Sequence, residues 1–160
     1  MKTKLLSWLL TLSLLMTMLP TAALAAAVPG VNSGTVIYVS ETGNDSAVGD
    51  ESTPLKTIGA AFTQAVDGDT ICLLSDIKLV GKLVLTGDKS VTLTGKAGET
   101  AKKITYQKDT STDLYMIEVG VEYGTATKTN LTLENVTIDA EAQDIRCVRV
   151  CPGSQLILAD

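Results

Sequence analysis

The stretch that decides the fold reads YVSETGNDS at residues 38–46 and PLKTIGAAFTQAVDGDTICLL at residues 54–74. Its pattern is that of a strand, an acidic loop, a short amphipathic helix, a glycine turn and a second strand. Pro54 follows Ser and Thr, a common helix start, and the Asp-Gly-Asp turn at Gly68 is expected to end the helix. One apolar stripe runs along this helix at i, i+3, i+4 and i+7, formed by Ile58, Ala61, Phe62 and Ala65. Because strands follow, the stripe is expected to lie across a structure built of strands.

Three segments of this stretch resemble the start of secreted right-handed parallel β-helix proteins of the pectin-lyase-like fold. They are YVSETGND, the pattern TPLKTIxxAxxxA, and GDTICL. The resemblance covers residues 35–75 closely, whereas the later strands follow the family only in style. It implies an N-terminal cap, in which Ile58, Ala61, Phe62 and Ala65 cover the first coil and Gly68 makes the turn. It implies little about activity, because this fold carries lyases, hydrolases, epimerases and non-catalytic surface proteins.

Residues 1–25 have the pattern of a bacterial secretory signal peptide. Lys2 and Lys4 precede an apolar run, and Ala23-Leu24-Ala25 offers a small-residue cleavage site. The competing interpretation is a membrane anchor, but the run is short and interrupted by Ser and Thr. We therefore expect a secreted protein, extracellular or on the cell surface. Its expected parts are a linker at 26–34, a strand and capping helix at 35–75, and coils at 76–160.

The charge of the chain argues against nucleic acid as a partner. The whole chain has 13 basic and 18 acidic residues, and loss of the signal peptide with its two Lys would leave a net charge of −7. An acidic chain of about 135 residues forms a single domain without a basic footprint for nucleic acid or anionic lipid. The absence of His excludes His-based catalytic triads and ordinary zinc sites.

Three cysteines, Cys72, Cys147 and Cys151, remain after signal cleavage, and an odd number does not make a disulfide framework. Cys147 and Cys151 stand four apart in an extended segment, about 13 Å from one another, which is too far for a bridge. We predict free thiols at all three positions.

From Thr70 onward the chain is a series of short runs with strand character, separated by Gly, Asp, Asn and Ser. The runs lie at 71–73, 82–85, 91–94, 103–106, 116–119, 131–133, 136–138, 147–150 and 156–158. The run at 131 recurs at 156, a spacing of 25 residues that suits one coil of a β-solenoid. The sequence therefore predicts an all-β fold, a right-handed parallel β-helix with a short capping helix. The alternative is an antiparallel β-sandwich.

Within each run the apolar residues are expected to point inward, onto the coil below, and the Thr residues outward. The expected inward residues are Val91, Leu93, Leu131, Leu133, Val136, Ile138, Val148 and Val150; the expected outward residues are Thr92, Thr132, Thr137 and Arg149. Because the sequence has no polar closing segment after its last apolar run, we expect a truncated fragment, open at the C-terminal end. Further coils of the same protein, or a stacking copy, are the expected partners there.

One cluster could carry chemistry. It consists of carboxylates and arginines at Asp139, Glu141, Asp144, Arg146 and Arg149, and it is similar in kind to the residues with which β-helix lyases bind Ca²⁺ and abstract a proton. No position matches a lyase motif, and a solvated turn with an exposed ion pair is the preferred interpretation. Asp45, Asp50 and Glu51 form a second candidate Ca²⁺ site, although turn formation explains them as well. Tyr106, Tyr115 and Tyr123 border long loops and could line a shallow groove, but ordinary half-buried strand tyrosines are the preferred interpretation.

Three functions are compatible with these observations. The preferred one is a non-catalytic, adhesin-like surface protein that presents loops to extracellular carbohydrate or host matrix, without a cofactor. The second is the N-terminal part of a polysaccharide lyase or glycoside hydrolase whose catalytic coils lie beyond residue 160. The third is a self-assembling solenoid module. The first is preferred because the mature chain has few aromatic residues and no convergent acidic groove.

Overall fold

The computed structural model describes residues 34–110, 112–122, 127–141 and 143–159. The predicted signal peptide, nearly all of the predicted linker and Tyr123 lie outside these residues. Twelve elements are present in the described part of the chain: β1 (Val36–Val39), α2 (Ile58–Gln64), β2 (Thr70–Leu73), β3 (Ile77–Val80), β4 (Leu83–Leu85), β5 (Ser90–Gly95), β6 (Lys102–Gln107), β7 (Tyr115–Val119), β8 (Asn130–Glu134), β9 (Val136–Asp139), β10 (Arg146–Val150) and β11 (Gln155–Ala159).

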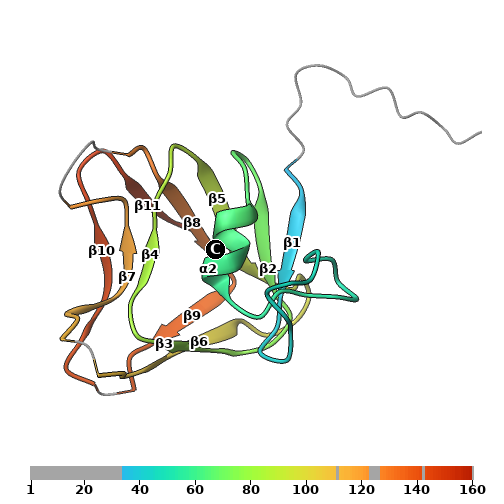
Figure 1. The fold of residues 1–160 in the computed structure, drawn as a ribbon, viewed down its shortest axis with the longest axis horizontal. Coiled ribbons are helices and arrows are strands. Elements are labelled where there is room, and N and C mark those ends of the chain that lie inside the picture. Colours follow the sequence, from blue (N-terminus) through green and yellow to red (C-terminus); the bar gives the residue numbers. More distant parts are fainter. Residues whose placement is uncertain (1–33, 111, 123–126, 142, 160) are drawn as a thin grey trace, which may run out of the picture. The chain divides into compact units, whose positions relative to one another are not determined.

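The fold consists mostly of β-strands in three parallel sheets, with one short helix (Figure 1). Sheet A has the strand order β1-β2-β5-β8-β11, sheet B has β3-β6-β9 and sheet C has β4-β7-β10. All paired strands run parallel. From β2 onward the chain enters sheets A, B and C in turn, so that each strand pairs with the strand three places further on. The parallel pairing contradicts the antiparallel sandwich.

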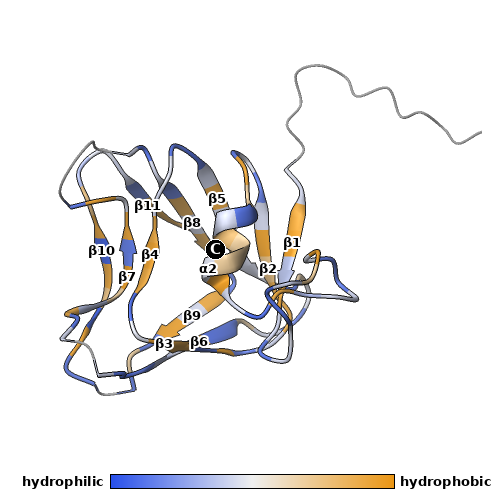
Figure 2. Ribbon diagram, viewed as in Figure 1, coloured by the Kyte–Doolittle hydropathy of each residue, from blue (hydrophilic) through white to orange (hydrophobic). Residues whose placement is uncertain are grey.

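The core is built from columns of residues in register. In sheet A, one column joins Ile37, Ile71, Leu93, Leu133 and Leu158 across five strands. The first four are buried, whereas Leu158 on the last strand is 75% exposed. Apolar residues alternate with polar ones along the strands, as Figure 2 shows, because successive side chains of a strand point to opposite faces. Each strand therefore buries its apolar face against the next strand of its sheet.

The helix α2 begins after Thr57, whose hydroxyl accepts a hydrogen bond from the Ala60 N–H at 3.1 Å. The sequence pattern predicts a helix that begins near Pro54 and ends at the Gly68 turn. The observed helix begins later and ends earlier, so it is shorter at both ends. It contacts β1, β2 and β4. Its apolar stripe, Ile58, Ala61, Phe62 and the following Ala65, is buried in the main core, and Gly68 has a φ of 88°.

Lys89 connects the turn before β5 to the C-terminal end of α2 through hydrogen bonds. Its ammonium group donates hydrogen bonds to the carbonyl oxygens of Phe62 and of Ala65, the latter at 2.8 Å. It also lies 4.4 Å from the centroid of the Phe62 ring. A cation at this end stabilises a helix because the last carbonyl groups carry partial negative charge. Burial lowers the pKa of Lys89.

Replacing Lys89 by Met is therefore expected to lower the free energy of unfolding by about 1–2 kcal/mol, through loss of the helix-end interaction and the cation–π contact. Urea denaturation followed by circular dichroism measures this change. Lys128→Met is the control, since only its backbone N–H makes a hydrogen bond in the described structure. Equal stability of the two variants would contradict the role given to Lys89.

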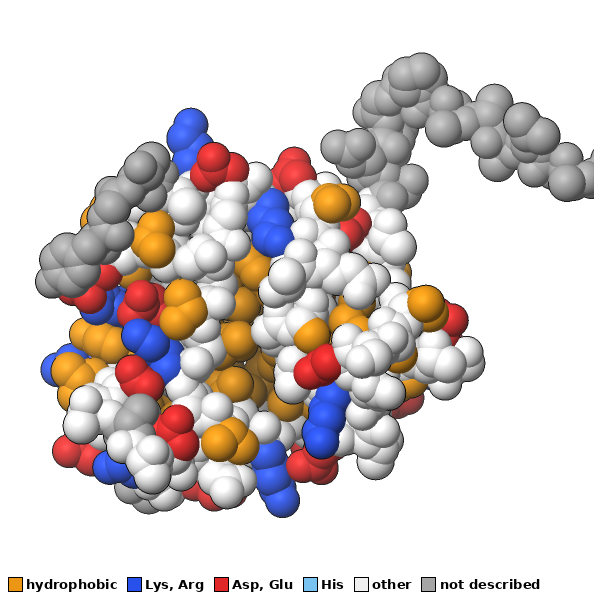
Figure 3. Space-filling model, viewed as in Figure 1, with side chains coloured by type: hydrophobic (Ala, Val, Ile, Leu, Met, Phe, Trp, Pro, Cys, Tyr) orange, Lys and Arg blue, Asp and Glu red, His pale blue; other side chains and the backbone are white. Residues whose placement is uncertain are grey.

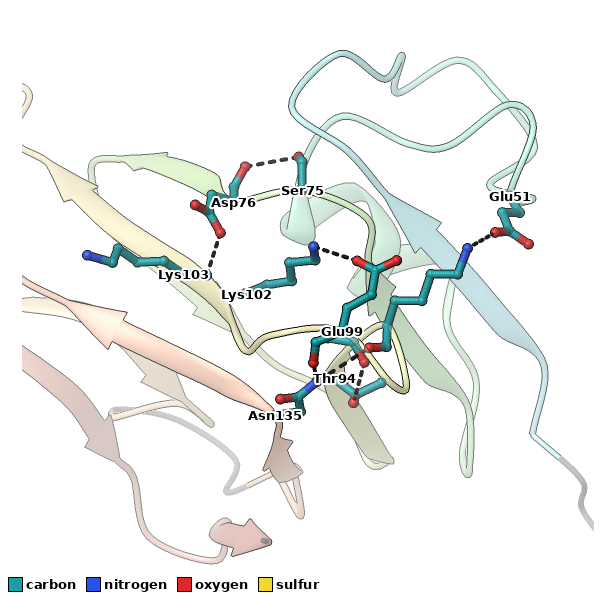
Figure 4. Close-up of polar contacts among 10 residues, drawn as sticks. Glu51, Ser75, Asp76, Thr94, Glu99, Lys102, Lys103 and Asn135 are labelled. Atoms are coloured by element: carbon teal, nitrogen blue, oxygen red, sulfur yellow. Dashed lines mark hydrogen bonds and ion pairs between the residues drawn. The ribbon is translucent and has the colours of Figure 1, made fainter.

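The corner between sheets A and B depends on Asn135, which joins β8 to β9 (Figure 4). Its φ is 48°, a left-handed conformation that Asn adopts more easily than most residues. Its side-chain amide donates to the carbonyl oxygens of Lys96 and Glu99 at 3.4 and 3.3 Å. A Cβ atom on Gly95 would lie 2.5 Å from the Asn135 carbonyl oxygen, so only Gly allows this approach.

Two features differ from the sequence-based expectation. The strand β3 was missed, because its sequence, Ile-Lys-Leu-Val, lies close to the next run and has no turn signal before it other than Ser75-Asp76. Val150 belongs to an inward column with Leu85 and Val119, which are fully buried, yet it is 43% exposed. It lies on the last strand of sheet C, and no further strand of the described chain covers it.

Candidate functional site

A groove of about 450 Å³ lies on the outer face of sheet C. Charged side chains of both signs gather over this part of the surface, on the left of Figure 3. Its lining comes from the residue before β4, from β7 and β10, and from the segments on either side of β7: Lys82, Thr112, Asp113, Leu114, Tyr115, Glu118, Val121, Glu122 and Arg149. The volume is within the range of small-molecule sites.

The register of sheet C places the polar side chains of the groove side by side. The register pairs Glu118 on β7 with Val84 on β4 at one side and with Arg149 on β10 at the other. Their neighbours in each strand, such as Ile117, belong to the core. Since adjacent residues in a strand face opposite sides, the core packing of one set directs the other set outward. The sheet thereby brings together residues that are up to 65 positions apart in the sequence.

Glu118 is the centre of the charge arrangement. The residue is 7% exposed, and its carboxylate lies 3.4 Å from the Lys82 ammonium and 3.9 Å from the Arg149 guanidinium. Lys82 also lies 3.6 Å from the Asp113 carboxylate, and Arg149 forms two close contacts with Glu122. A nearly buried carboxylate is stable only with such partners. The result is a network of alternating charges across the outer face of the sheet, formed by Lys82, Asp113, Glu118, Glu122 and Arg149 and called the charge network below.

Tyr115 forms one end of this charge network. The Arg146 guanidinium donates to the Tyr115 hydroxyl at 3.2 Å, and its central carbon lies 5.5 Å from the ring centroid. The corresponding carbon of Arg149 lies 5.1 Å from the same centroid. Both are within the range of cation–π attraction. Two arginines and one tyrosine thus present a fixed set of hydrogen-bond donors.

The electrostatics of Arg149 favour binding over proton transfer. The hydrogen bonds to Glu122 raise the pKa of the Arg149 guanidinium above its usual value. A guanidinium held in its charged form donates hydrogen bonds but does not abstract a proton. Arg149 is therefore suited to orient a polar ligand.

The structure separates the candidate catalytic residues. Asp139 lies on sheet B, where its carboxylate pairs with Lys103 at 3.1 Å and accepts the Glu141 N–H at 2.9 Å. The Glu141 N–H and Lys103 lower the pKa of Asp139. Asp144 is exposed and shares with Arg146 a smaller hollow that borders the groove at Leu114, but Asp144 does not line the groove itself. Only Arg146 and Arg149 come together with the charge network.

The candidate Ca²⁺ ligands hold the loop before α2 together. The Asp45 carboxylate accepts the Lys56 and Thr57 N–H groups, both at 2.8 Å. Asp50 accepts from the backbone and hydroxyl groups of Ser52 and Thr53, which lowers its pKa. Glu51, which is labelled in Figure 4, pairs with Lys96. In the described ranges there is no group of three or more His, Cys, Asp or Glu residues arranged for a metal ion.

The remaining candidates are placed as follows. All three cysteines are free; Cys72 and Cys151 are buried, and burial raises the pKa of both thiols, whereas Cys147 is exposed. Tyr106 is 2% exposed and belongs to the core, and it does not line the groove on sheet C. Tyr115 does line the groove, and Tyr123 is not among the described residues.

Sequence reasoning missed Lys82, Asp113, Glu118 and Glu122. The signal for Glu118 was its place between the apolar residues Ile117 and Val119, which marks an outward position in a strand. Its partners could not be found without the register, because they come from other strands and from loops.

The one helix in the described part of the chain has seven residues, and none there is long and apolar enough to cross a membrane. The chain shows no significant match to a protein-family model, to a curated protein or to a solved structure.

Proposed function

We propose that the chain is part of a secreted, right-handed parallel β-helix protein that serves as a non-catalytic scaffold at the bacterial cell surface. The rotation of strands through three parallel sheets and the in-register apolar columns support a solenoid. The right hand is expected because parallel crossover connections have this hand almost without exception. The position of α2 against β1, β2 and β4 supports a cap over the first coil.

The groove on sheet C is the proposed contact surface, and its ligand is an extracellular polysaccharide. A polysaccharide offers rows of hydroxyl and carboxylate groups, which match alternating donors and acceptors on a rigid sheet. The single observation that carries this proposal is the nearly buried Glu118 between Lys82 and Arg149. Such a network keeps several charged groups in fixed positions at the surface, so that little conformational entropy is lost on binding.

Arg149→Ala is expected to weaken binding of polygalacturonate at least tenfold, because it removes a fixed donor and leaves Glu118 with one cation fewer. Isothermal titration calorimetry at low salt measures the affinity of the secreted chain. Lys103→Ala is the matched control, since it also removes a strand cation paired with a carboxylate, but on sheet B. An equal loss of affinity in both variants would show that net charge alone explains the effect, and it would contradict a role of the groove in binding.

The same samples test the non-catalytic assignment. Incubation with polygalacturonate, with and without Ca²⁺, is expected to give no unsaturated product by ultraviolet absorbance. Product formation that disappears in Arg149→Ala would overturn the assignment and favour a polysaccharide lyase.

A further inference from the structure

The first strands of the three sheets are not covered equally. Sheet A begins with β1, which pairs with β2, whereas sheets B and C begin with β3 and β4. The helix α2 packs against β1, β2 and β4. On β3, Leu79 is only half-buried, although its register partner on the next strand, Tyr106, is 2% exposed. Beside β3, the described structure therefore leaves apolar side chains within reach of solvent.

A second groove, of about 450 Å³, lies at this place between the start of α2 and β3 and is called the α2–β3 groove below. Figure 3 shows it as a hollow with apolar side chains at its bottom, to the left of and below α2. Thr35, where the described chain enters β1, is hydrogen-bonded to Asp69 and lies at the other end of this strand from Glu41. The described residues that line the groove are Glu41, Lys56, Thr57, Ile58, Gly59, Lys78, Leu79, Val80, Lys82, Leu83 and Gln107.

The bottom of the α2–β3 groove is aliphatic. Ile58 and Leu83 belong to the buried core, and Val80, which is 61% exposed, adds to the apolar lining. A Cβ atom on Gly59 would lie 3.5 Å from a methyl carbon of Leu83, which is an ordinary contact distance. Among the described lining residues there is no aromatic side chain on which a sugar ring would stack. The apolar surface therefore suits an alkyl chain better than a carbohydrate.

The lining carries an excess of positive charge within an acidic chain. Three lysines and one glutamate give a local balance of +2, whereas the whole chain has a net charge of −5. Lys82 already pairs with two carboxylates of the charge network. In the described part of the chain, Lys56 and Lys78 are exposed and form no ion pair. Two ammonium groups are thus available to an anion beside the aliphatic surface.

We propose that the α2–β3 groove binds an alkyl carboxylate of medium chain length, a compound with an apolar tail and one anionic head group. The tail replaces water on Ile58 and Leu83, and the ammonium groups of Lys56 and Lys78 hold the carboxylate. Burial of each methylene group supplies affinity, and the two lysines select against a cation of the same shape. The proposal is independent of polysaccharide binding, because Lys82, which lines both grooves, keeps its partners in the charge network.

Isothermal titration calorimetry of the secreted chain with decanoate, octanoate and decylamine, each below its micelle concentration, tests the choice of ligand. Decanoate is expected to bind about tenfold more tightly than octanoate, because octanoate buries two methylene groups fewer. Decylamine has the same tail and a positive charge, and it is expected to bind about tenfold more weakly than decanoate, although the acidic chain as a whole attracts it. Equal binding of the two decyl compounds would overturn the proposal. So would the absence of decanoate binding, as for a groove filled by another segment of the chain.

A variant of the helix locates the bound tail. Gly59→Leu places a side chain against Leu83 within the groove and is expected to abolish decanoate binding. Folding should be retained, because Leu has a higher helix propensity than Gly. Thr63→Leu is the matched control, since it adds the same side chain at an exposed helix position that does not line the groove, and its affinity should be unchanged. Decanoate binding by a folded Gly59→Leu chain would contradict this site.

The two lysines provide a test that leaves the apolar surface intact. Lys56→Gln and Lys78→Gln, combined in one chain, are expected to weaken decanoate binding about tenfold. The melting temperature should stay the same, because neither lysine forms an ion pair in the described structure. Lys128→Gln, at an exposed position outside the groove, is the control for net charge. Unchanged affinity in the double variant, or an equal loss in the control, would overturn the proposal.

Discussion

Phe62→Asp is expected to abolish secretion of the folded chain. The Phe62 ring is 3% exposed and packs in the main core, with Lys89 over it. Removing a buried aromatic ring costs about 3–5 kcal/mol, and placing a carboxylate in the same apolar site adds a further penalty. The sum is of the order of the whole stability of a domain of this size.

The neighbouring residue provides the control for this prediction. Thr63 follows Phe62 on the helix but is exposed, so Thr63→Asp adds the same charge one position away without entering the core. Secreted yield and melting temperature should be nearly unchanged in Thr63→Asp, while Phe62→Leu should lose only part of the stability. A folded, normally secreted Phe62→Asp chain would falsify the view that α2 covers the first strands.

The second large effect is expected at Asp69, which is 4% exposed. Its two carboxylate oxygens accept the Thr35 N–H at 2.7 Å and the Val66 N–H at 2.8 Å. It thereby joins the beginning of β1 to the turn between α2 and β2. Asp69→Ala leaves both N–H groups without this acceptor and is expected to cost about 2–4 kcal/mol, which corresponds to a fall in melting temperature of about 10 °C.

Asp67 in the same turn is the matched control for Asp69. It is exposed and accepts one hydrogen bond, from the Ser90 N–H at 2.8 Å. Asp67→Ala is expected to cost no more than about 1 kcal/mol. Differential scanning calorimetry compares the two variants, and an equal loss in both would show that burial of Asp69 contributes nothing.

Some of the strands were easier to predict than others. The run at 131–133 alternates apolar and polar residues, and the run at 156–158 is continuously apolar. Both are bounded by polar or turn residues, so they were recognised, and they pair with Leu131 opposite Leu156. The strand β3 was missed because a Lys lies among its apolar residues and only two residues separate it from β4. Short strands lack the length over which a period can be recognised.

The candidate site was predicted only in part. Arg146 and Arg149 were singled out with acids close to them in the sequence, but their partners in the structure are Tyr115, Glu118 and Glu122. Asp139, although only seven residues before Arg146, lies on another sheet because the chain turns a corner between β9 and β10. Proximity in sequence was the wrong guide here.

The sequence by itself determined the short helix, most of the strands and their inward and outward faces, because propensity and alternation are local properties of the chain. Only the tertiary structure decided which strands pair, and therefore which charges meet at Glu118. These depend on register between segments some 25 to 40 residues apart, and register is set by how whole faces pack together rather than by any one segment.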